Sequence, residues 1–274
     1  MGPEWEKNMN SSEYESYAVD VVKRAGAILH EKYHGVQEVS QKGGDPRDDI
    51  TAADKEINAF LVQDVAKRFP EHSIYSEEAP DEDKQSALAW AFDPIDGTSN
   101  FARAIPHFAI CASLLENGIP IAGAFYNPVT DELFSFSEEQ GAMVNKSQVK
   151  ASSVADPMKA QILFHVGRKP EKFDWGAATF HSLLSGTKKL KDLGSSSLDL
   201  AFVAAGRVDA VVYGTLSTRD IAGAIGMVCA AGGEVYELKT GEPVTIGKEP
   251  QTIVAVANRE LYEALLPLLH PELL

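Results

Sequence analysis

The spacing of apolar residues changes near residue 150, and this change constrains the fold of the 274-residue chain more than any other feature. Residues 72–145 hold short apolar runs separated by Gly, Pro and Asn, which is typical of neighbouring strands in one sheet. Beyond them, apolar strands alternate with helical segments, so helices must cover the faces of a second sheet. The pattern predicts two halves that pack as layers, 12–150 and 151–274, after a polar tail at 1–11. A cleft between the halves is the natural place for a site.

Two helices are predicted ahead of the first sheet. Residues 13–33 repeat apolar side chains at the spacing of one helical face, and Thr51 can cap a second helix over 52–69, which Pro70 ends. Residues 41–49 are rich in Gly, Pro and Asp and predict a loop. The first sheet is expected to contain the apolar runs 72–76, 87–93, 107–118, 120–136 and 141–145, with turns at 117–118 and 128–131.

The second half is expected to alternate strands and helices. The predicted strands are 161–167, 188–194, 208–214, 233–238 and 252–258. The predicted helices are 173–184, 196–206, 218–231 and 259–269.

The charge balance limits the partners of this chain. Asp and Glu outnumber Lys and Arg by 40 to 25, which gives a formal net charge of −15. Such a chain repels phosphate backbones, and no Lys/Arg-rich block offers a local exception, so nucleic-acid binding is not expected. A small anionic substrate would need metal ions to bridge it to the chain.

The cysteines and the hydropathy of the chain indicate in which cellular compartment the protein is expected. Cys111 and Cys229 stand in apolar runs without the Cys-x-x-Cys spacing of a metal site, so both are expected to be buried, reduced thiols of a cytoplasmic protein. The N-terminal residues lack the apolar core of a signal peptide, and no window approaches the roughly eighteen apolar residues of a membrane span. Neither secretion nor membrane insertion is expected.

The segment WAFDPIDGTSNF, residues 90–101, is the most informative for chemistry. Asp93 and Asp96 follow a predicted buried strand, and the rigid Pro94 and the permissive Gly97 allow a tight turn between strand and helix. Two carboxylates and the Ile95 carbonyl can therefore converge on one point, where oxygen ligands suit a hard cation. Asp-Pro and Asp-Gly are also common turn dipeptides, so a purely structural turn is the alternative.

Further polar groups are expected near this turn. Backbone N–H groups of Gly97 and Thr98 open a turn or short helix, and such groups suit a phosphate. Glu77-Glu78 end another predicted strand, and if the two strands are neighbours, Glu77 and Asp93 end on the same sheet edge. Carboxylates gathered at one edge repel one another strongly unless cations neutralise them.

These residues resemble the signature of the inositol monophosphatase family, within the lithium-sensitive, magnesium-dependent phosphatase superfamily. The resemblance rests on Asp93-Pro94-Ile95-Asp96-Gly97-Thr98 followed by Asn100-Phe101. Three more elements stand in the expected order: DDITAAD at 48–54, Glu77-Glu78, and Asp220 in RDIAGAIGMVCAAGGEV. The resemblance implies an α+β fold, a layered αβαβα sandwich of the inositol monophosphatase and fructose-1,6-bisphosphatase type, and a homodimer.

The resemblance also implies roles for individual residues. Two or three Mg²⁺ ions would be bound by oxygen ligands from Glu77, Asp93, the Ile95 carbonyl, Asp96 and Asp220. Asp54 and Thr98 would orient and activate the attacking water, with Glu77 counted among the catalytic residues, and the Gly97 and Thr98 amides would hold the phosphate. For Asp54 and Asp220 the alternative is an acid at the start of a helix, where it acts only as a cap.

The substrate side is less defined by the sequence. Gly194-Ser195-Ser196 resembles the family's turn that contacts substrate hydroxyls, together with Asp96, although Ser196 and Asp199 also have the spacing of an ordinary capping box. Two positions depart from the family. Tyr213 stands where inositol-specific members typically carry Glu, and Arg219 stands where Trp is usual. Arg219 is expected to be either a solvated surface charge or a grip for a second anionic group of the substrate.

The function implied is Mg²⁺-dependent hydrolysis of inositol-1-phosphate, or of a related small polyol or sugar phosphate, by a metal-activated water. Alternatives on the same fold are a fructose-1,6-bisphosphatase, a histidinol-phosphatase or a 3'-phosphoadenosine nucleotide phosphatase. A non-catalytic relative and a protein with a structural calcium site are alternatives of a different class. The expected partner is a small phosphorylated substrate, with neither nucleic acid nor membrane.

Overall fold

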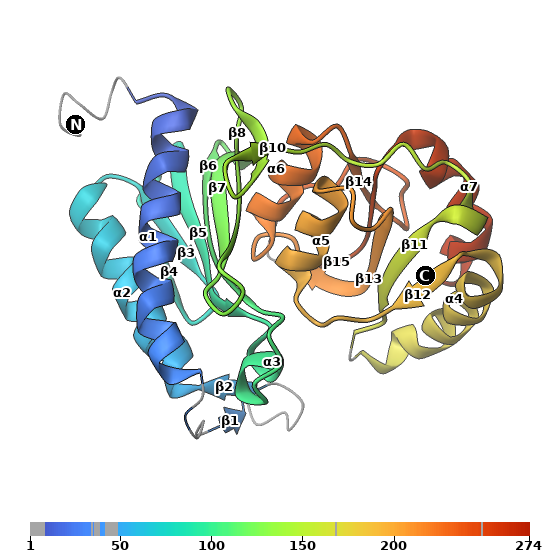
Figure 1. The fold of residues 1–274 in the computed structure, drawn as a ribbon, viewed down its shortest axis with the longest axis horizontal. Coiled ribbons are helices and arrows are strands. Elements are labelled where there is room, and N and C mark those ends of the chain that lie inside the picture. Colours follow the sequence, from blue (N-terminus) through green and yellow to red (C-terminus); the bar gives the residue numbers. More distant parts are fainter. Residues whose placement is uncertain (1–8, 34, 36–38, 42–48, 168, 248) are drawn as a thin grey trace.

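The computed structural model describes residues 9–33, 35, 39–41, 49–167, 169–247 and 249–274, and these form two α/β halves that pack side by side (Figure 1). The elements of the N-terminal half are α1 (Ser11–Lys32), β1 (Val39–Gln41), β2 (Asp49–Thr51), α2 (Ala52–Arg68), β3 (Ser73–Ser76), β4 (Ala79–Glu82), β5 (Leu88–Asp96), α3 (Thr98–Ala102), β6 (Ala109–Glu116), β7 (Ile119–Asn127), β8 (Glu132–Ser137), β9 (Gly141–Val144) and β10 (Ser147–Gln148). Those of the C-terminal half are the 3-10 helix η3 (Pro157–Lys159), β11 (Gln161–His165), η4 (Pro170–Lys172), α4 (Phe173–Gly186), β12 (Lys189–Lys191), α5 (Ser196–Ala204), β13 (Ala210–Ser217), α6 (Ala222–Ala230), β14 (Glu234–Glu237), β15 (Pro250–Val256), α7 (Arg259–Leu269) and η5 (Pro271–Leu273).

The two sheets differ in topology. The N-terminal sheet has the order β10-β9-β8-β7-β6-β5-β3-β4, and β3 and β5 run parallel, with Ser76 opposite Phe92. The C-terminal sheet has the order β12-β11-β13-β15-β14, with β11, β12 and β13 parallel. The predicted neighbourhood of the strands that precede Glu77 and Asp93 is therefore confirmed.

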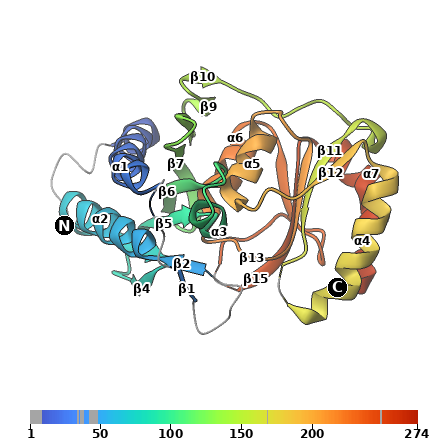
Figure 2. The same cartoon turned by 60° about the horizontal axis from the view of Figure 1, so that its bottom comes forward.

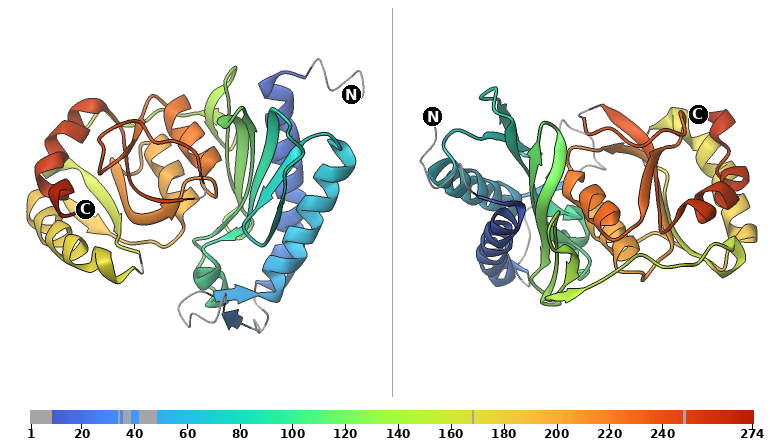
Figure 3. Two further views of the ribbon diagram at one scale, coloured as in Figure 1. Left: turned by 180° about the vertical axis from the view of Figure 1, so that it is seen from behind. Right: turned by 90° about the horizontal axis from the view of Figure 1, so that it is seen from above.

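Five layers stack across the molecule (Figures 2 and 3). Helices α1 and α2 bury an apolar face against the first sheet, in a cluster that includes Leu29, Leu61 and Trp90. Helices α5 and α6 lie between the two sheets, and α4 and α7 cover the far face of the second sheet. The predicted α+β fold, layered as αβαβα, is confirmed.

Local sequence accounts for the start of both N-terminal helices. Asn10 and Glu13 form a capping box at α1, and Thr51 and Asp54 form another at α2, so each helix begins where side chains satisfy its first N–H groups. Helix α1 thus begins at Ser11, the last residue assigned to the polar tail, while residues 1–8 lie outside the described part.

Some boundaries differ from the prediction. Helix α6 begins at Ala222 rather than at 218, because residues 218–221 form a turn in which the buried Thr218 hydroxyl donates to the Thr245 carbonyl. The unpredicted β4 (APDE) is a polar edge strand, where a proline is tolerated. Gln41 and Asp49, expected to be loop, pair between β1 and β2, and residues 42–48 lie outside the described part.

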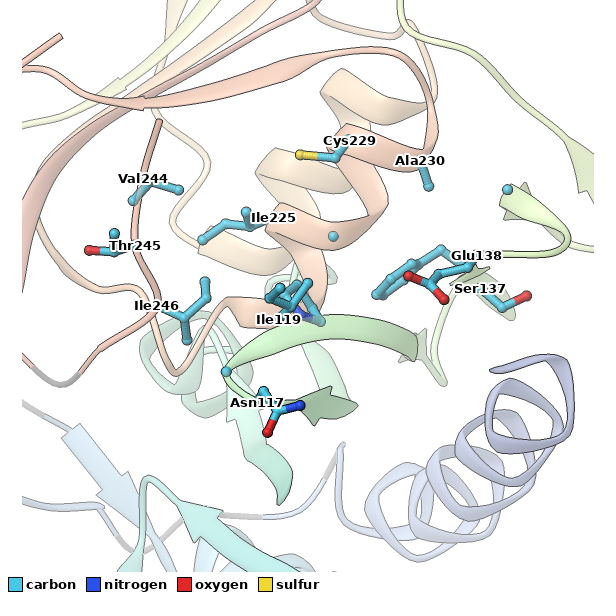
Figure 4. Close-up of a pocket in the computed structure, with 15 residues that line it drawn as sticks. Asn117, Ile119, Ser137, Glu138, Ile225, Cys229, Ala230, Val244, Thr245 and Ile246 are labelled. Carbon is cyan, nitrogen blue, oxygen red and sulfur yellow. The ribbon is translucent and has the colours of Figure 1, made fainter. Parts of the chain in front are cut away.

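The cysteine prediction is half right. Cys111 in β6 is buried, as expected, but Cys229 is exposed, because it lies on the side of α6 that faces a surface pocket (Figure 4). None of the helices described here is long and apolar enough to cross a membrane.

Candidate active site

The predicted acidic residues gather where β3 and β5 end. Glu77 directly follows β3, and Asp93 lies within β5 next to Phe92, the residue opposite Ser76; because the two strands are parallel, Glu77 and Asp93 lie at the same end of the strand pair. Asp93 is 5% exposed, and its carboxylate accepts a hydrogen bond from the Ile95 N–H at 3.0 Å. Burial raises the pKa of Asp93 well above its usual value, and repulsion from Glu77, Asp96 and Asp220 raises it further.

Asp220 reaches this cluster from the other half. It lies in the turn between β13 and α6, and its charge is close enough to contribute to the raised pKa of Asp93. Four carboxylates from distant parts of the chain therefore meet at the junction of the two halves.

The donor set fits a hard divalent cation. Buried carboxylates that repel one another are stabilised when a cation neutralises them, and oxygen is the ligand that Mg²⁺ prefers. Among the described residues, however, no group of three or more His, Cys, Asp or Glu side chains is already arranged to hold a metal ion. Asp93 shares a hydrogen bond with Glu77, and both oxygens of Asp96 accept hydrogen bonds from the α5 turn.

Asp96 binds the N-terminus of α5. Its Oδ2 accepts from the Ser195 hydroxyl at 2.5 Å and from the Ser197 N–H at 2.7 Å. Its Oδ1 accepts from the N–H and the hydroxyl of Ser196 at 3.0 and 2.8 Å. Burial raises the pKa of Asp96, while these hydrogen bonds oppose the rise. The carboxylate therefore ties β5 of one half to α5 of the other.

Gly97 permits the close packing around Asp96. Its φ of +95° lies in the left-handed region, and a Cβ there would approach the carbonyl oxygens of His107 and Gly194 to 3.1 and 3.2 Å. Asn100 reinforces the same corner, because its amide donates to the carbonyls of His107 and Leu193, each at 2.8 Å. The turn predicted to hold a phosphate is thus fixed by both halves.

Thr98 and Asp54 form the expected pair. The Thr98 hydroxyl lies 3.0 Å from Asp54 Oδ1 and 2.9 Å from the Ile95 carbonyl oxygen, so its single hydrogen has two acceptors. Asp54 Oδ2 accepts from the N–H and the hydroxyl of Thr51 at 2.7 and 2.6 Å. Asp54 is therefore a helix-capping residue and a partner of Thr98 at the same time.

The predicted substrate turn is brought to the cluster, but not by the capping box. Ser195, not Ser196, is the N-cap of α5, and its side chain makes no capping bond within the helix. The Asp199 carboxylate instead accepts from the Tyr213 hydroxyl at 2.7 Å and lies 2.9 Å from His107 Nε2. The alternative of an ordinary capping box is therefore wrong.

Tyr213, His107 and Asp199 form a buried network behind the substrate turn. Tyr213 is 4% exposed, and burial and the Asp199 charge raise its pKa well above its usual value, so its hydroxyl stays protonated and donates. Sequence reasoning missed Asp199 and His107, because the two lie 92 residues apart. Their pairing has no local signal beyond a polar residue inside an apolar segment.

Arg219 is not a solvated surface charge, because its guanidinium has partners within the structure. Its Nη1 lies 3.0 Å from Asp81 Oδ2 in β4, and its guanidinium carbon lies 4.8 Å from the centre of the Tyr75 ring in β3. Its side chain is 16% exposed, so the ion pair is partly shielded from water. Asp81 was also missed by the sequence analysis.

A separate apolar pocket of about 710 Å³ lies on another part of the junction (Figure 4). It is lined by the turn between β6 and β7, by β8, by α6 and by residues 244–246. None of the predicted site residues lines it. The carboxylate cluster, and not this pocket, is therefore the candidate active site.

Comparisons with known proteins cover nearly the whole chain. Residues 10–273 match the description "Inositol monophosphatase family". Inositol monophosphatase 1 of Solanum lycopersicum is 31% identical, covering 94% of this chain and 95% of the relative. Nus factor SuhB of Escherichia coli strain K12 is 32% identical, covering 82% and 85%.

The fold has solved counterparts. A crystal structure of extragenic suppressor protein suhB from Bartonella henselae superposes with a TM-score of 0.84 at 30% identity, covering 92% of this chain and 96% of that one. Sequence and structural similarity thus extend over both halves.

Proposed function

The chain belongs to the inositol monophosphatase family, and on that premise we propose that it is a Mg²⁺-dependent phosphomonoesterase acting on inositol-1-phosphate or a related small polyol or sugar phosphate. The observation that carries the proposal is the hydrogen bond between Thr98 and Asp54 beside a buried, mutually repelling carboxylate cluster. Through Thr98, the proton acceptor Asp54 of α2 is joined to the turn that carries Asp93 and Asp96, whose carboxylates would help to hold the cation. A cytoplasmic homodimer belongs to the same proposal and is supported by the family resemblance.

Glu77, Asp93, Asp96, Asp220 and the Ile95 carbonyl would hold two or three ions. When bound, Mg²⁺ supplies Lewis acidity that neutralises phosphoryl oxygens and favours deprotonation of water. Asp93, whose pKa burial raises, would have to be ionised to serve as a ligand, since carboxylates bind metal ions in their ionised form.

Thr98 and Asp54 would move the proton. The Thr98 hydroxyl accepts a hydrogen bond from the attacking water while it donates its own hydrogen to Asp54 Oδ1. Asp54 stays correctly oriented, because Thr51 holds its other oxygen. Such general base assistance accelerates a reaction by about 10²- to 10⁴-fold.

The N–H groups of Gly97 and Thr98 would hold the phosphate, and the α5 turn would bind the rest of the substrate. Ser195 and Ser196 have hydroxyl groups suited to a polyol. The Tyr213 hydroxyl donates its single hydrogen to Asp199 behind this turn, so it does not replace the carboxylate of a Glu that would accept a hydrogen bond from a ring hydroxyl. This difference favours a polyol or sugar phosphate over strict recognition of inositol-1-phosphate.

The proposal is tested by phosphate release from full-length protein with Mg²⁺ or with EDTA. The esters are inositol-1-phosphate, fructose-1,6-bisphosphate, histidinol phosphate, 3'-phosphoadenosine 5'-phosphate and glycerol-2-phosphate. Release is expected only with Mg²⁺, and Asp93→Asn is expected to abolish it. Asp64→Asn is the matched control, because Asp64 binds Tyr17 and Arg24 outside the site.

The preferred ester decides between the substrate alternatives. Folded wild-type protein that releases phosphate from none of the esters would contradict the proposal and favour the non-catalytic alternative.

A further inference from the structure

Arg219 joins the two strands that flank Glu77 to the turn that carries Asp220. It precedes Asp220 directly, and its own N–H donates to the Gly247 carbonyl at 3.1 Å. Its side chain crosses to the N-terminal half, where it pairs with Asp81 of β4 and stacks on Tyr75 of β3. Glu77 and Glu78 form the connection between these two strands.

The outer strand of this pair, β4, has few backbone contacts of its own. Strand β4 is the outermost strand of its sheet, and it pairs with β3 at only two positions, with a register shift between them. Strand β4 is therefore weakly fixed by its own backbone, whereas β3 is also paired with β5, and the Glu77 N–H donates to the Phe92 carbonyl at 3.3 Å. The side chain of Arg219 adds a charge-assisted hydrogen bond and a cation–π contact from the opposite half.

We propose that Arg219 is a positioning residue that sets the distance between Glu77 and Asp220, and thereby the affinity of the site for a divalent cation. The inference rests on the proposed metal site. It replaces the expectation that Arg219 grips a second anionic group of the substrate, because the guanidinium already has a carboxylate partner. Groups that orient metal ligands typically change metal affinity by about 10- to 100-fold when removed.

Arg207 offers a matched control within the same molecule. It also pairs across the two halves, through a two-pronged contact with Glu132 of β8, one arm of which measures 2.8 Å. Its guanidinium carbon lies 4.9 Å from the centre of the Phe202 ring and 5.3 Å from that of Phe134. The chemistry is therefore the same, but the contact is not attached to a predicted metal ligand.

The experiment measures Mg²⁺ binding by calorimetry, together with the thermal midpoint without metal, for full-length wild type, Arg219→Gln and Arg207→Gln. Arg219→Gln is expected to weaken Mg²⁺ binding by about tenfold, whereas Arg207→Gln changes it less than about twofold. Both variants are expected to lower the thermal midpoint. The double variant Asp81→Asn/Arg219→Gln should bind Mg²⁺ as tightly as Arg219→Gln alone, because each substitution breaks the same ion pair.

The outcomes separate the two proposals. Wild type that binds no Mg²⁺ overturns the proposed function and the inference with it. Wild-type affinity retained in Arg219→Gln overturns the inference alone. A raised KM for fructose-1,6-bisphosphate with unchanged Mg²⁺ affinity would instead restore the role of Arg219 as an anion grip.

A second variant keeps the test decisive if Arg219→Gln does not fold. Tyr75→Leu leaves the ion pair, keeps an apolar side chain beside the cluster of Ala91, Leu115 and Ala222, and removes the aromatic ring that stacks on Arg219. It is expected to weaken Mg²⁺ binding in the same direction, and unchanged affinity there also overturns the inference.

Discussion

The two halves contribute opposite chemistry to the candidate site. The N-terminal half presents acceptors: the carboxylates of Glu77, Asp93 and Asp96 at the ends of β3 and β5, and that of Asp54 at the start of α2. The C-terminal half presents donors at the start of α5, apart from Asp220. Neither half alone satisfies Asp96, so the site is completed only where the halves meet. A catalytic centre of this kind depends on packing between layers as much as on its own residues.

Among these substitutions, the largest change in kcat is expected for the Thr98–Asp54 contact, which lies entirely within the N-terminal half. Thr98→Val removes the hydroxyl that bonds Asp54, while Thr98→Ser keeps it. We expect Thr98→Val to reduce kcat for phosphate release by about 10³-fold, which corresponds to about 4 kcal/mol of activation free energy. Thr98→Ser should keep kcat within about tenfold of wild type. Equal rates in the two variants would remove Thr98 from the proton path.

A smaller effect is expected where donors of one half meet acceptors of the other. Ser195→Ala removes the 2.5 Å bond to Asp96, and Ser137→Ala removes a 2.7 Å bond to Glu15 within the N-terminal half. Each is expected to lower the free energy of unfolding by about 2 kcal/mol, measured with urea. Only Ser195→Ala should also reduce phosphate release. Unchanged release in Ser195→Ala would show that this contact is structural only.

Acid should destabilise the N-terminal half through His72. Burial, aided by Lys84, lowers the pKa of His72 to about 4, and its Nδ1 accepts a hydrogen bond from Trp90 Nε1 at 3.1 Å. The unfolded chain therefore takes up a proton first, and stability is lost as pH falls from about 6.5 towards 4.

Because His72 is partly screened by water, the free energy of unfolding is expected to fall by about 1–2 kcal/mol over this pH range. It is measured as the difference between wild type and His72→Gln at each pH, which cancels the carboxylates common to both. Parallel pH profiles for the two proteins would contradict this assignment.

The smallest change is expected when the hydrogen bond between Tyr213 and Asp199, next to the substrate turn, is removed. Tyr213→Phe removes the bond to Asp199, and Tyr17→Phe removes an equal 2.7 Å bond to Asp64 far from the site. Each is expected to cost about 1 kcal/mol in unfolding free energy. Tyr213→Phe alone should raise KM while kcat changes little. An unchanged KM would confine Tyr213 to a structural role.

The sequence by itself determined the local parts of this protein. Capping residues start α2 at Thr51, apolar periodicity marks α1 and α7, and the apolar runs that form β3 and β5 were predicted as strands with acidic residues at their ends. These features depend on residues close in the chain, whose spacing decides helix, strand or turn. The predicted set of acidic residues was implied by the resemblance of four short motifs, at 48–54, 77–78, 93–98 and around Asp220, to those of a known family.

Only the tertiary structure decided the partners of those residues. Ser195 and Asp96 lie 99 residues apart, and Arg219 and Asp81 lie 138 apart. No local pattern joins such residues, because their contact depends on how α5 and the turn before α6 pack against the first sheet. The same packing leaves Cys229 exposed although its segment is apolar. The spacing of residues in the sequence determines the helices and strands, whereas the packing of the layers against one another determines which side chains are in contact.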